Sequence, residues 1–454
     1  MPLIPPISEN AQAQAAYQAL RGRAWRIVWL VLIVGVVAAT AWRSVRNYDD
    51  PAVSAMDRDH QGQFDFHNGV YFPARAFLSG VSPYGSRFAE QYPVTRPLPL
   101  MSPGVLLIHS PLGLLPVTAA EIAYYAINVI LLVWLGWMCV NWIEDADQRL
   151  NWWLVSCLLI FASRSGHTTL LTGYMTALLV IGTVVALSQA RTRPWLAACG
   201  VLLASCKPTY AIPLFLLLVA RGDQRAAWRG LALSVMAAGL AVGRLLLSTT
   251  PQQFLTDLRL GQAAHMADAA ELPINTWTRI DLLALVAKWF AWAPSELMHL
   301  CVMVCLLPLP ALALWRLRRV DDEDCSAAGL SSGVIAVSML ATLYHHVYDA
   351  LLLFPIIVGL LLEAPSTQRG RRSIRLMMGM LLLFVTWNYA SSDFVLRRLD
   401  LSGLQQRWVT SASAIALATS WLGVCLLAWL PRASGLPAKK GHTLQESGLL
   451  TNDC

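Results

Sequence analysis

The stretch that decides the fold of this chain is AAEIAYYAINVILLVWLGWMCVN, residues 119–141, in which Glu121 is the only charged side chain. About 20 apolar residues in helical conformation cross the hydrocarbon core of a bilayer. The segment is therefore predicted to be a membrane-spanning helix. Comparable apolar segments recur from end to end, so the sequence predicts an all-α polytopic membrane protein.

The overall composition points to lipid as well. Of the 454 residues, 56% are hydrophobic and 13% are charged, and the mean hydropathy is +0.51. A soluble fold could not bury so many apolar side chains without a large exposed patch. The net charge of +7 comes from Lys and Arg in short loops rather than from a dense basic run, so no nucleic-acid partner is predicted. The nine cysteines lack CxxC spacing, so neither a disulfide nor a zinc site is predicted.

A hydropathy window of about 19 residues gives about twelve predicted spans. They cover residues 25–42, 119–141, 152–166, 168–189, 194–206, 208–220, 229–248, 295–315, 327–345, 349–363, 374–391 and 409–431. The first span is predicted to be retained, because no small-residue cleavage pattern follows it. We expect a cytoplasmic N-terminal segment at 1–24, one transmembrane domain at 25–431 and a cytoplasmic tail at 432–454.

The distribution of basic residues predicts the topology. If Arg21, Arg23 and Arg26 lie in the cytoplasm, alternation places the other short basic loops there too. Two longer loops, 43–118 and 249–294, then lie outside. Both mix short apolar runs with Pro and Gly, as re-entrant or interfacial helices do. We expect these two structured loops to roof a cavity on the extracytoplasmic face, with both termini cytoplasmic, in a prokaryotic plasma (inner) membrane.

The first of these loops carries the most informative pattern. It contains FDFHNGVYFPARAFLSGVSPYG at 64–85, then Tyr92-Pro93, then PGVLLIHSPLGLLP at 103–116. An acidic residue precedes Tyr and Ala on a helix, followed by Gly-x-x-Pro-Tyr, Tyr-Pro and Pro-Leu-x-x-Leu-Pro. This layout resembles the first external loop of glycosyltransferase family 87, membrane enzymes of the GT-C superfamily that use polyprenyl-phosphate sugars.

Further elements follow in the order seen in that family. They are LTGYMT at 171–176, Lys207-Pro208, NTWTR at 275–279 and HHVYD at 345–349. The chain departs from the family pattern at Tyr174, where members tend to have Gln, and at Trp277 and Thr278, which replace a small Gln-Ser pair. These departures concern the sugar and the acceptor more than the reaction class.

The resemblance implies a GT-C fold and an inverting sugar transfer, mannose by default, from polyprenyl phosphate to a glycolipid or polysaccharide acceptor, without a cofactor or metal. Such a reaction needs a carboxylate to take the proton of the acceptor hydroxyl. Asp65 falls on the family's acidic position and is the expected general base; its alternative role is the N-cap of a helix. Asp57 or Asp59 is the alternative catalytic carboxylate. These two residues could instead bind a metal ion together or belong to a solvated acidic loop.

The departing phosphate needs cations rather than a general acid. Lys207 ends an apolar run before a proline, so it either meets this phosphate or snorkels to the interface. Arg279 either binds the phosphate bidentately or anchors its loop to lipid headgroups. His345 and His346 are expected to bind the donor phosphate, with Asp349 on the same helical face. A metal site and simple polar packing remain the alternatives for these three residues.

Asn275, Tyr71, Tyr84 and His167 complete the expected substrate-binding set. The two tyrosines either stack on sugar or pack at the interface, and His167, like Arg164, either lines the site or caps its own helix. The rival function is a secondary transporter or a flippase for a lipid-linked sugar, because such proteins also bury ionisable groups. The absence of an internal repeat and the gathering of polar clusters at one face favour an enzyme. A non-catalytic assembly subunit with the same fold is a further alternative.

Overall fold

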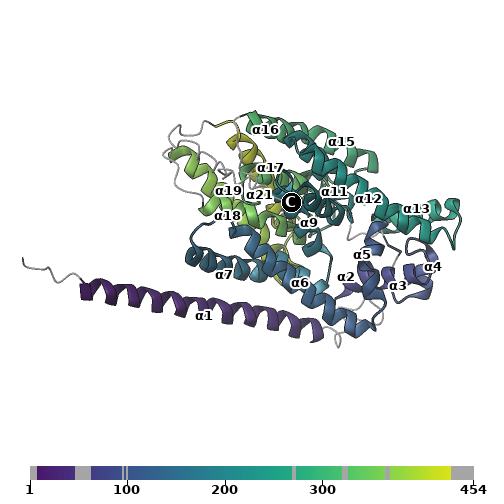
Figure 1. Ribbon diagram of the computed structural model, residues 1–454. Coiled ribbons are helices and arrows are strands. Elements are labelled where there is room, and N and C mark those ends of the chain that lie inside the picture. Colours follow the sequence, from purple (N-terminus) through teal and green to yellow (C-terminus); the bar gives the residue numbers. More distant parts are fainter. Residues whose placement is uncertain are drawn as a thin grey trace, which may run out of the picture.

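A computed structural model of the chain describes residues 8–46, 63–94, 97–98, 101–267, 272–319, 326–362 and 369–430. In these ranges the regular elements are helices, and the only extended pairing is one isolated antiparallel bridge between Arg279 and His346. The predicted all-α class is therefore confirmed for the part of the chain that is described (Figure 1).

Six helical segments are long and apolar enough to cross a membrane. They lie in α1 (Ser8–Arg46), α6 (Val117–Val140), α12 (Gln224–Leu245), α15 and α16 (Glu296–Leu306 and Pro308–Arg319), α19 (Arg369–Trp387) and α21 (Gly403–Leu427). The pair α7 (Ala146–Ala162) and α8 (Arg164–Thr172), bent by 63°, makes a seventh if it is counted as one span. The chain is a multi-pass membrane protein, and the larger number of about twelve spans stays a prediction.

The structure also has shorter apolar helices of 10–17 residues, which lie at predicted spans except for the one at 104–113 in the predicted loop 43–118. These are α5 (Gly104–Gly113), α9 (Thr176–Gln189), α10 (Pro194–Ala204), α11 (Pro208–Arg221), α17 (Leu330–Thr342) and the continuous pair η4 (Val347–Leu353) and α18 (Phe354–Leu362). Proline is the first residue of α10 and of α11, because its fixed φ suits the first helical turn, where its missing N–H would have no intrahelical partner. Short helices of this kind end inside the protein, so the polar loop residues next to their ends are buried as well.

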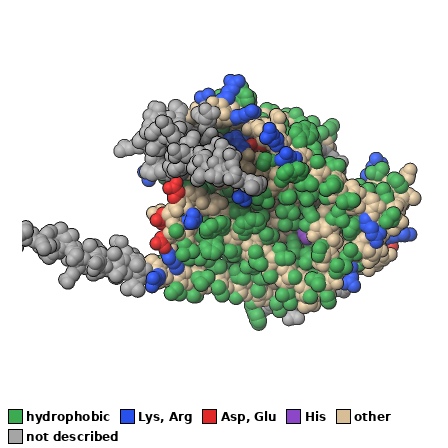
Figure 2. All heavy atoms as spheres, viewed as in Figure 1, with side chains coloured by type: hydrophobic (Ala, Val, Ile, Leu, Met, Phe, Trp, Pro, Cys, Tyr) green, Lys and Arg blue, Asp and Glu red, His purple; other side chains and the backbone are tan. Residues whose placement is uncertain are grey.

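The centre of the helical body is formed by α9 and α17, which are buried on almost every face. The outer helices expose apolar side chains instead, such as Val34 on α1 and Leu240 on α12. Hydrophobic side chains cover most of the visible surface, and basic side chains gather near its edges (Figure 2). This is the surface that a lipid environment stabilises.

Most of the small helices from the two long loops lie at one end of the body (Figure 1), whereas α14 (Leu282–Phe290) packs against α21. The first loop supplies α2 (Phe64–Phe66), the π turn η3 (His67–Tyr71), α3 (Phe72–Leu78) and α4 (Ser86–Gln91), and the second supplies α13 (Pro251–Ala267) and α14 (Leu282–Phe290). The rings of Tyr84 and Phe254 lie 6.0 Å apart, centroid to centroid, where these loops meet. Near the C-terminal end, η5 (Tyr389–Ser391) and α20 (Asp393–Leu399) connect α19 to α21.

Helices α9 and α10 cross closely at two glycines. A Cβ added to Gly200 would lie 2.7 Å from the backbone nitrogen of Ala186, whereas one added to Gly239, on the exposed face of α12, would meet nothing within 4 Å.

Gly200→Ala is expected to lower stability by about 1–3 kcal/mol through overpacking. Gly239→Ala should leave the melting temperature unchanged or raise it, since alanine favours helix. Thermal unfolding in detergent checks both, and equal melting temperatures would contradict the close crossing.

Candidate active site

A buried ion pair joins two segments that are far apart in the sequence. Lys207 stands at the N-cap position of α11, where the chain turns out of α10, and Asp349 lies in η4. The Lys207 Nζ donates to the Asp349 Oδ2 over 2.8 Å. Lys207 is 5% exposed and Asp349 is fully buried. Because a buried charge is unfavourable unless it is paired and hydrogen-bonded, this pair is a fixed feature of the fold.

The Asp349 carboxylate accepts further hydrogen bonds. The Tyr210 hydroxyl donates to Oδ1 over 3.0 Å, the His346 backbone N–H donates to Oδ2 over 3.0 Å, and the His345 Nδ1 lies 3.1 Å from Oδ2. Both histidines of the HHVYD motif thus meet the aspartate of the same motif. This set of donors holds the carboxylate in its ionised form and in one orientation.

Four tyrosine rings surround the Lys207 ammonium. The Nζ lies 5.6 to 5.7 Å from the ring centroids of Tyr174, Tyr210, Tyr344 and Tyr348. Cations bind the faces of aromatic rings at such distances, most strongly where water is excluded. The rings of Tyr174 and Tyr348 also contact each other, with centroids 4.8 Å apart. Tyr174, one of the departures from the family pattern, therefore belongs to this tyrosine cage.

A second buried ion pair lies next to the cage, within the second long loop. The Arg279 Nε and Nη2 donate to the two oxygens of Asp281 over 2.8 and 2.9 Å, and the guanidinium lies 4.6 Å from the centroid of the Tyr344 ring. Burial alone would raise the pKa of Asp281, but Arg279 outweighs it and holds this pKa below its usual range. The Arg279 guanidinium therefore has a fixed partner in Asp281.

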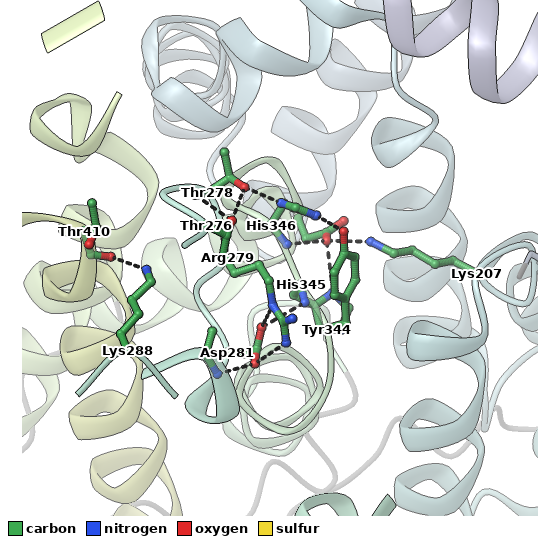
Figure 3. Close-up of polar contacts among 12 residues, drawn as sticks. Lys207, Thr276, Thr278, Arg279, Asp281, Lys288, Tyr344, His345, His346 and Thr410 are labelled. Atoms are coloured by element: carbon green, nitrogen blue, oxygen red, sulfur yellow. Dashed lines mark hydrogen bonds and ion pairs between the residues drawn. The ribbon is translucent and has the colours of Figure 1, made fainter. Parts of the chain in front are cut away.

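Backbone pairing ties the second loop to the histidine motif. The Val347 N–H donates to the Thr278 carbonyl over 2.8 Å and the Ile280 N–H donates to the His345 carbonyl over 3.0 Å. On the side-chain level, the Thr278 hydroxyl lies 2.6 Å from the His346 Nδ1, and the other ring nitrogen of His346 contacts the Tyr344 hydroxyl (Figure 3). The His346 ring is thus held at both nitrogens.

The charges of this centre nearly cancel. Lys207 faces Asp349 and Arg279 faces Asp281, each as a one-to-one pair. Lys288 on α14 is also buried; it donates to the Thr410 carbonyl over 3.2 Å, and burial lowers its pKa to about 8. The centre is therefore polar and preorganised without a large net charge.

Asp65 lies close to this centre. It is part of α2 and partly buried, and a Cβ added to Gly69, four residues further along the chain, would be 4.0 Å from the Tyr174 ring. Gln63, not Asp65, takes the N-cap position of α2. Helix α2 lies against the end of α8: a Cβ added to Gly173, which has a φ of +70°, would be 2.7 Å from the Cβ of Phe66. The segment that carries Asp65 therefore packs beside Gly173 and Tyr174, and Tyr174 is a member of the Lys207 cage.

A comparison with protein-family models gives one match, glycosyltransferase family 87, over residues 101–343. The chain belongs to glycosyltransferase family 87. This confirms the resemblance and makes the protein a membrane glycosyltransferase of the GT-C type. The matched range contains Lys207 and Arg279, whereas Asp65 and Asp349 lie outside it. Neither the curated proteins nor the solved structures include a match to the chain.

Two predicted substrate contacts of this family 87 member are buried in packing roles. The Tyr71 hydroxyl donates to the Leu115 carbonyl over 2.9 Å and accepts from Arg75 over 2.8 Å. The Tyr84 hydroxyl donates to the Met101 carbonyl over 3.2 Å, and burial raises the pKa of Tyr84 above its usual range. Both tyrosines thus have the contacts expected of the interfacial-packing alternative.

Other predicted residues lie apart from the ion pairs. The Asn275 side chain is exposed on the second loop, and the His167 ring lies 6.4 Å from that of Tyr389. Arg164 is buried and donates to the carbonyls of Asn388 and Ser391 over 2.8 and 3.0 Å, which anchors the segment before α20. Asp57 and Asp59 lie outside the described residues. Among the residues that are described, no cluster of three or more His, Cys, Asp or Glu side chains is arranged to hold a metal ion.

Several members of the centre were missed by sequence reasoning. Asp281, Lys288 and the cage residues Tyr210, Tyr344 and Tyr348 were not among the predicted site residues. A signal existed for some of them, because Asp281 follows Arg279 by two positions and two tyrosines flank the histidine pair. Tyr210 and Lys288 stand in apolar helices, where nothing in the sequence distinguishes them from ordinary packing residues.

The Lys207–Asp349 pair can be tested by its energetic coupling. Lys207→Met strands a buried carboxylate and is expected to cost about 3–5 kcal/mol. The double variant Lys207→Met/Asp349→Asn should be less destabilised than the two single losses added together, because neither charge is then left alone. Thermal unfolding of the purified variants in detergent measures this coupling.

Lys288→Met is the matched control for this cycle. It also removes a buried ammonium, but Lys288 donates to a backbone carbonyl, so no carboxylate is stranded. We expect a much smaller loss of stability than for Lys207→Met. Additive losses in the cycle, or equal losses for the two lysine variants, would contradict the pairing described above.

Proposed function

We propose that this enzyme transfers a sugar, with mannose the first donor to test, from a polyprenyl-phosphate donor to a glycolipid or polysaccharide acceptor. The transfer inverts the anomeric centre and takes place at the extracytoplasmic face. The observation that carries the proposal is the packing of the segment of Asp65 beside Tyr174 of the Lys207 cage. A Cβ added to Gly173 would be 2.7 Å from the Phe66 Cβ, and one added to Gly69 would be 4.0 Å from the Tyr174 ring. One carboxylate next to a buried cation is the minimal set that this chemistry requires.

The proposed reaction is a single displacement. The acceptor hydroxyl oxygen forms a bond to the anomeric carbon of the donor sugar while the bond from that carbon to the phosphate oxygen breaks. Asp65 takes the hydroxyl proton as general base. Polyprenyl phosphate leaves with the electron pair as an anion, so it needs electrostatic stabilisation rather than a proton. Attack from the face opposite the phosphate inverts the configuration.

The phosphate is proposed to bind at Lys207, His345 and His346. Lys207 uses one of its N–H groups on Asp349, so the others are oriented within the cage. Asp349 is proposed to position this lysine. Arg279 has two of its three nitrogens on Asp281, so its contribution to phosphate binding is proposed through Nη1 and through the Tyr344 ring beneath it. Asn275, exposed on the second loop, is proposed to contact the acceptor.

The proposed membrane placement is a GT-C architecture of about twelve spans, as one domain over 25–431, in the plasma membrane. The six long spans are accompanied by shorter apolar helices, which are tolerated at membrane depth where protein surrounds them. The short basic loops support cytoplasmic termini and an extracytoplasmic position for the loops 43–118 and 249–294. A long apolar donor tail accounts for an active site at the membrane surface.

Sugar transfer by the reconstituted protein tests the proposal. Purified protein in liposomes is given radiolabelled polyprenyl-phosphate sugars together with extracted lipids and envelope polysaccharide. Transfer from at least one donor is expected, and Asp65→Asn should lower kcat by about 10²–10⁴-fold, as loss of a general base does. Glu90→Gln, an exposed carboxylate on α4 of the same loop, is the matched control and should keep full activity.

Two outcomes would overturn the proposal. Near-normal transfer by a folded Asp65→Asn variant would remove Asp65 from the role of base. Movement of a lipid-linked sugar across the bilayer with no transfer to any acceptor would favour a flippase instead.

A further inference from the structure

A third buried polar pair lies beside Asp65, outside the centre described above. The His67 Nε2 is 2.6 Å from the Glu121 Oε1, and the two residues are 0% and 8% exposed. His67 belongs to the first external loop, whereas Glu121 lies in the first turns of α6 and is the only charged residue of that apolar span. Burying these two ionisable groups requires removing water from both. Two apolar side chains in their place would not have this unfavourable desolvation.

The backbone changes its helical type at this pair. Asp65 lies in α2, and at His67 the chain widens into the π turn His67–Tyr71 before α3 continues. The Asn68 side chain donates to the Phe64 carbonyl over 2.9 Å, which helps to satisfy the backbone at this irregular turn. Single π turns within helices are rare and occur frequently at functional sites. Here the π turn begins two residues after the proposed base.

Helix α2 and the residue after it contact two other helices, α6 and α8. On α6, Glu121 meets His67 and Tyr124 stacks on Phe66 with ring centroids 4.7 Å apart, and residues three apart share one face of a helix. At the end of α8, Gly173 packs closely on Phe66. A Cβ added to Gly173 would be only 2.7 Å from the Phe66 Cβ. Asp65 is adjacent to the residue that is clamped between these helices.

We propose that His67 and Glu121 are positioning residues for Asp65. The hydrogen bond between His67 and Glu121 fixes the rotation of α2 against α6, which aims the Asp65 carboxylate at the acceptor hydroxyl. This inference rests on the proposed function of Asp65. A displacement of about 1 Å at a reacting group can cost about 10²-fold in rate. The donor phosphate binds to other elements, so its affinity should not depend on the pair.

Kinetics of variants in liposomes test the proposal. Glu121→Gln keeps the shape of the side chain and removes its charge, and it is expected to lower kcat by about 10-fold to 10²-fold, with the KM for the donor within about twofold of the parent. The exchanged pair His67→Glu/Glu121→His should recover part of the lost kcat. Tyr125→Phe is the matched control on α6, because its hydroxyl donates to the Val37 carbonyl on α1, away from Asp65; it should keep the parent kcat.

A double apolar variant separates positioning from packing. His67→Leu/Glu121→Leu is expected to keep or raise the melting temperature, since it removes the desolvation of two polar groups, and still to show the low kcat. Parent-like kcat in this variant or in Glu121→Gln would overturn the inference, as would a loss of kcat that simply follows the melting temperature. If Asp65→Asn abolishes transfer while the variants of His67 and Glu121 stay active, the positioning role is wrong and the proposed function stands. If the parent protein transfers no sugar, the proposed function itself is wrong.

Discussion

The buried ion pair between Lys207 and Asp349 is the interaction on which the centre of this protein depends. It joins residues 142 positions apart in the sequence, at the start of α11 and in η4. Removing both charges from water is unfavourable, and only a nearly complete set of hydrogen bonds and ring faces compensates for it. The tyrosine cage, the histidine motif and the backbone bridge to the second loop all contribute to that compensation.

This constraint also explains the short helices. A helix that ended at the membrane surface would leave its terminal residues in water or among headgroups. Helices α10 and α11 instead meet at Lys207 within the protein, and α17 stops at the histidine motif before η4 begins. Buried loop residues can then form a site whose polar groups satisfy one another, as buried polar groups in proteins do.

Much of this arrangement could be predicted from the sequence. Hydropathy established an all-α multi-pass protein, and the motif order led to the correct family. The predicted residues Lys207, His345, His346 and Asp349 do come together. The structure adds partners that hydropathy and motif order do not single out. Asp281 pairs with Arg279, and tyrosines from separate segments form the cage.

Other differences have local physical reasons. Asp65 had an alternative role as a helix cap, but Gln63 adopts the left-handed conformation at that position and Asp65 lies inside the helix. The window method counts apolar length and does not register a bend. It divided the predicted spans 152–166 and 168–189 within α8, whereas the chain bends by 63° between α7 and α8. The His67–Glu121 pair joins a loop to a span, and no spacing rule connects the two.

The most direct test of the account is an experimental structure of the protein in a lipid nanodisc with polyprenyl phosphate bound. The account predicts the phosphate within hydrogen-bonding distance of the Lys207 Nζ or the His345 Nε2, with Asp65 facing the space that the sugar occupies. A phosphate bound at the opposite, basic face of the helical body, with no ligand beside Lys207, would contradict it.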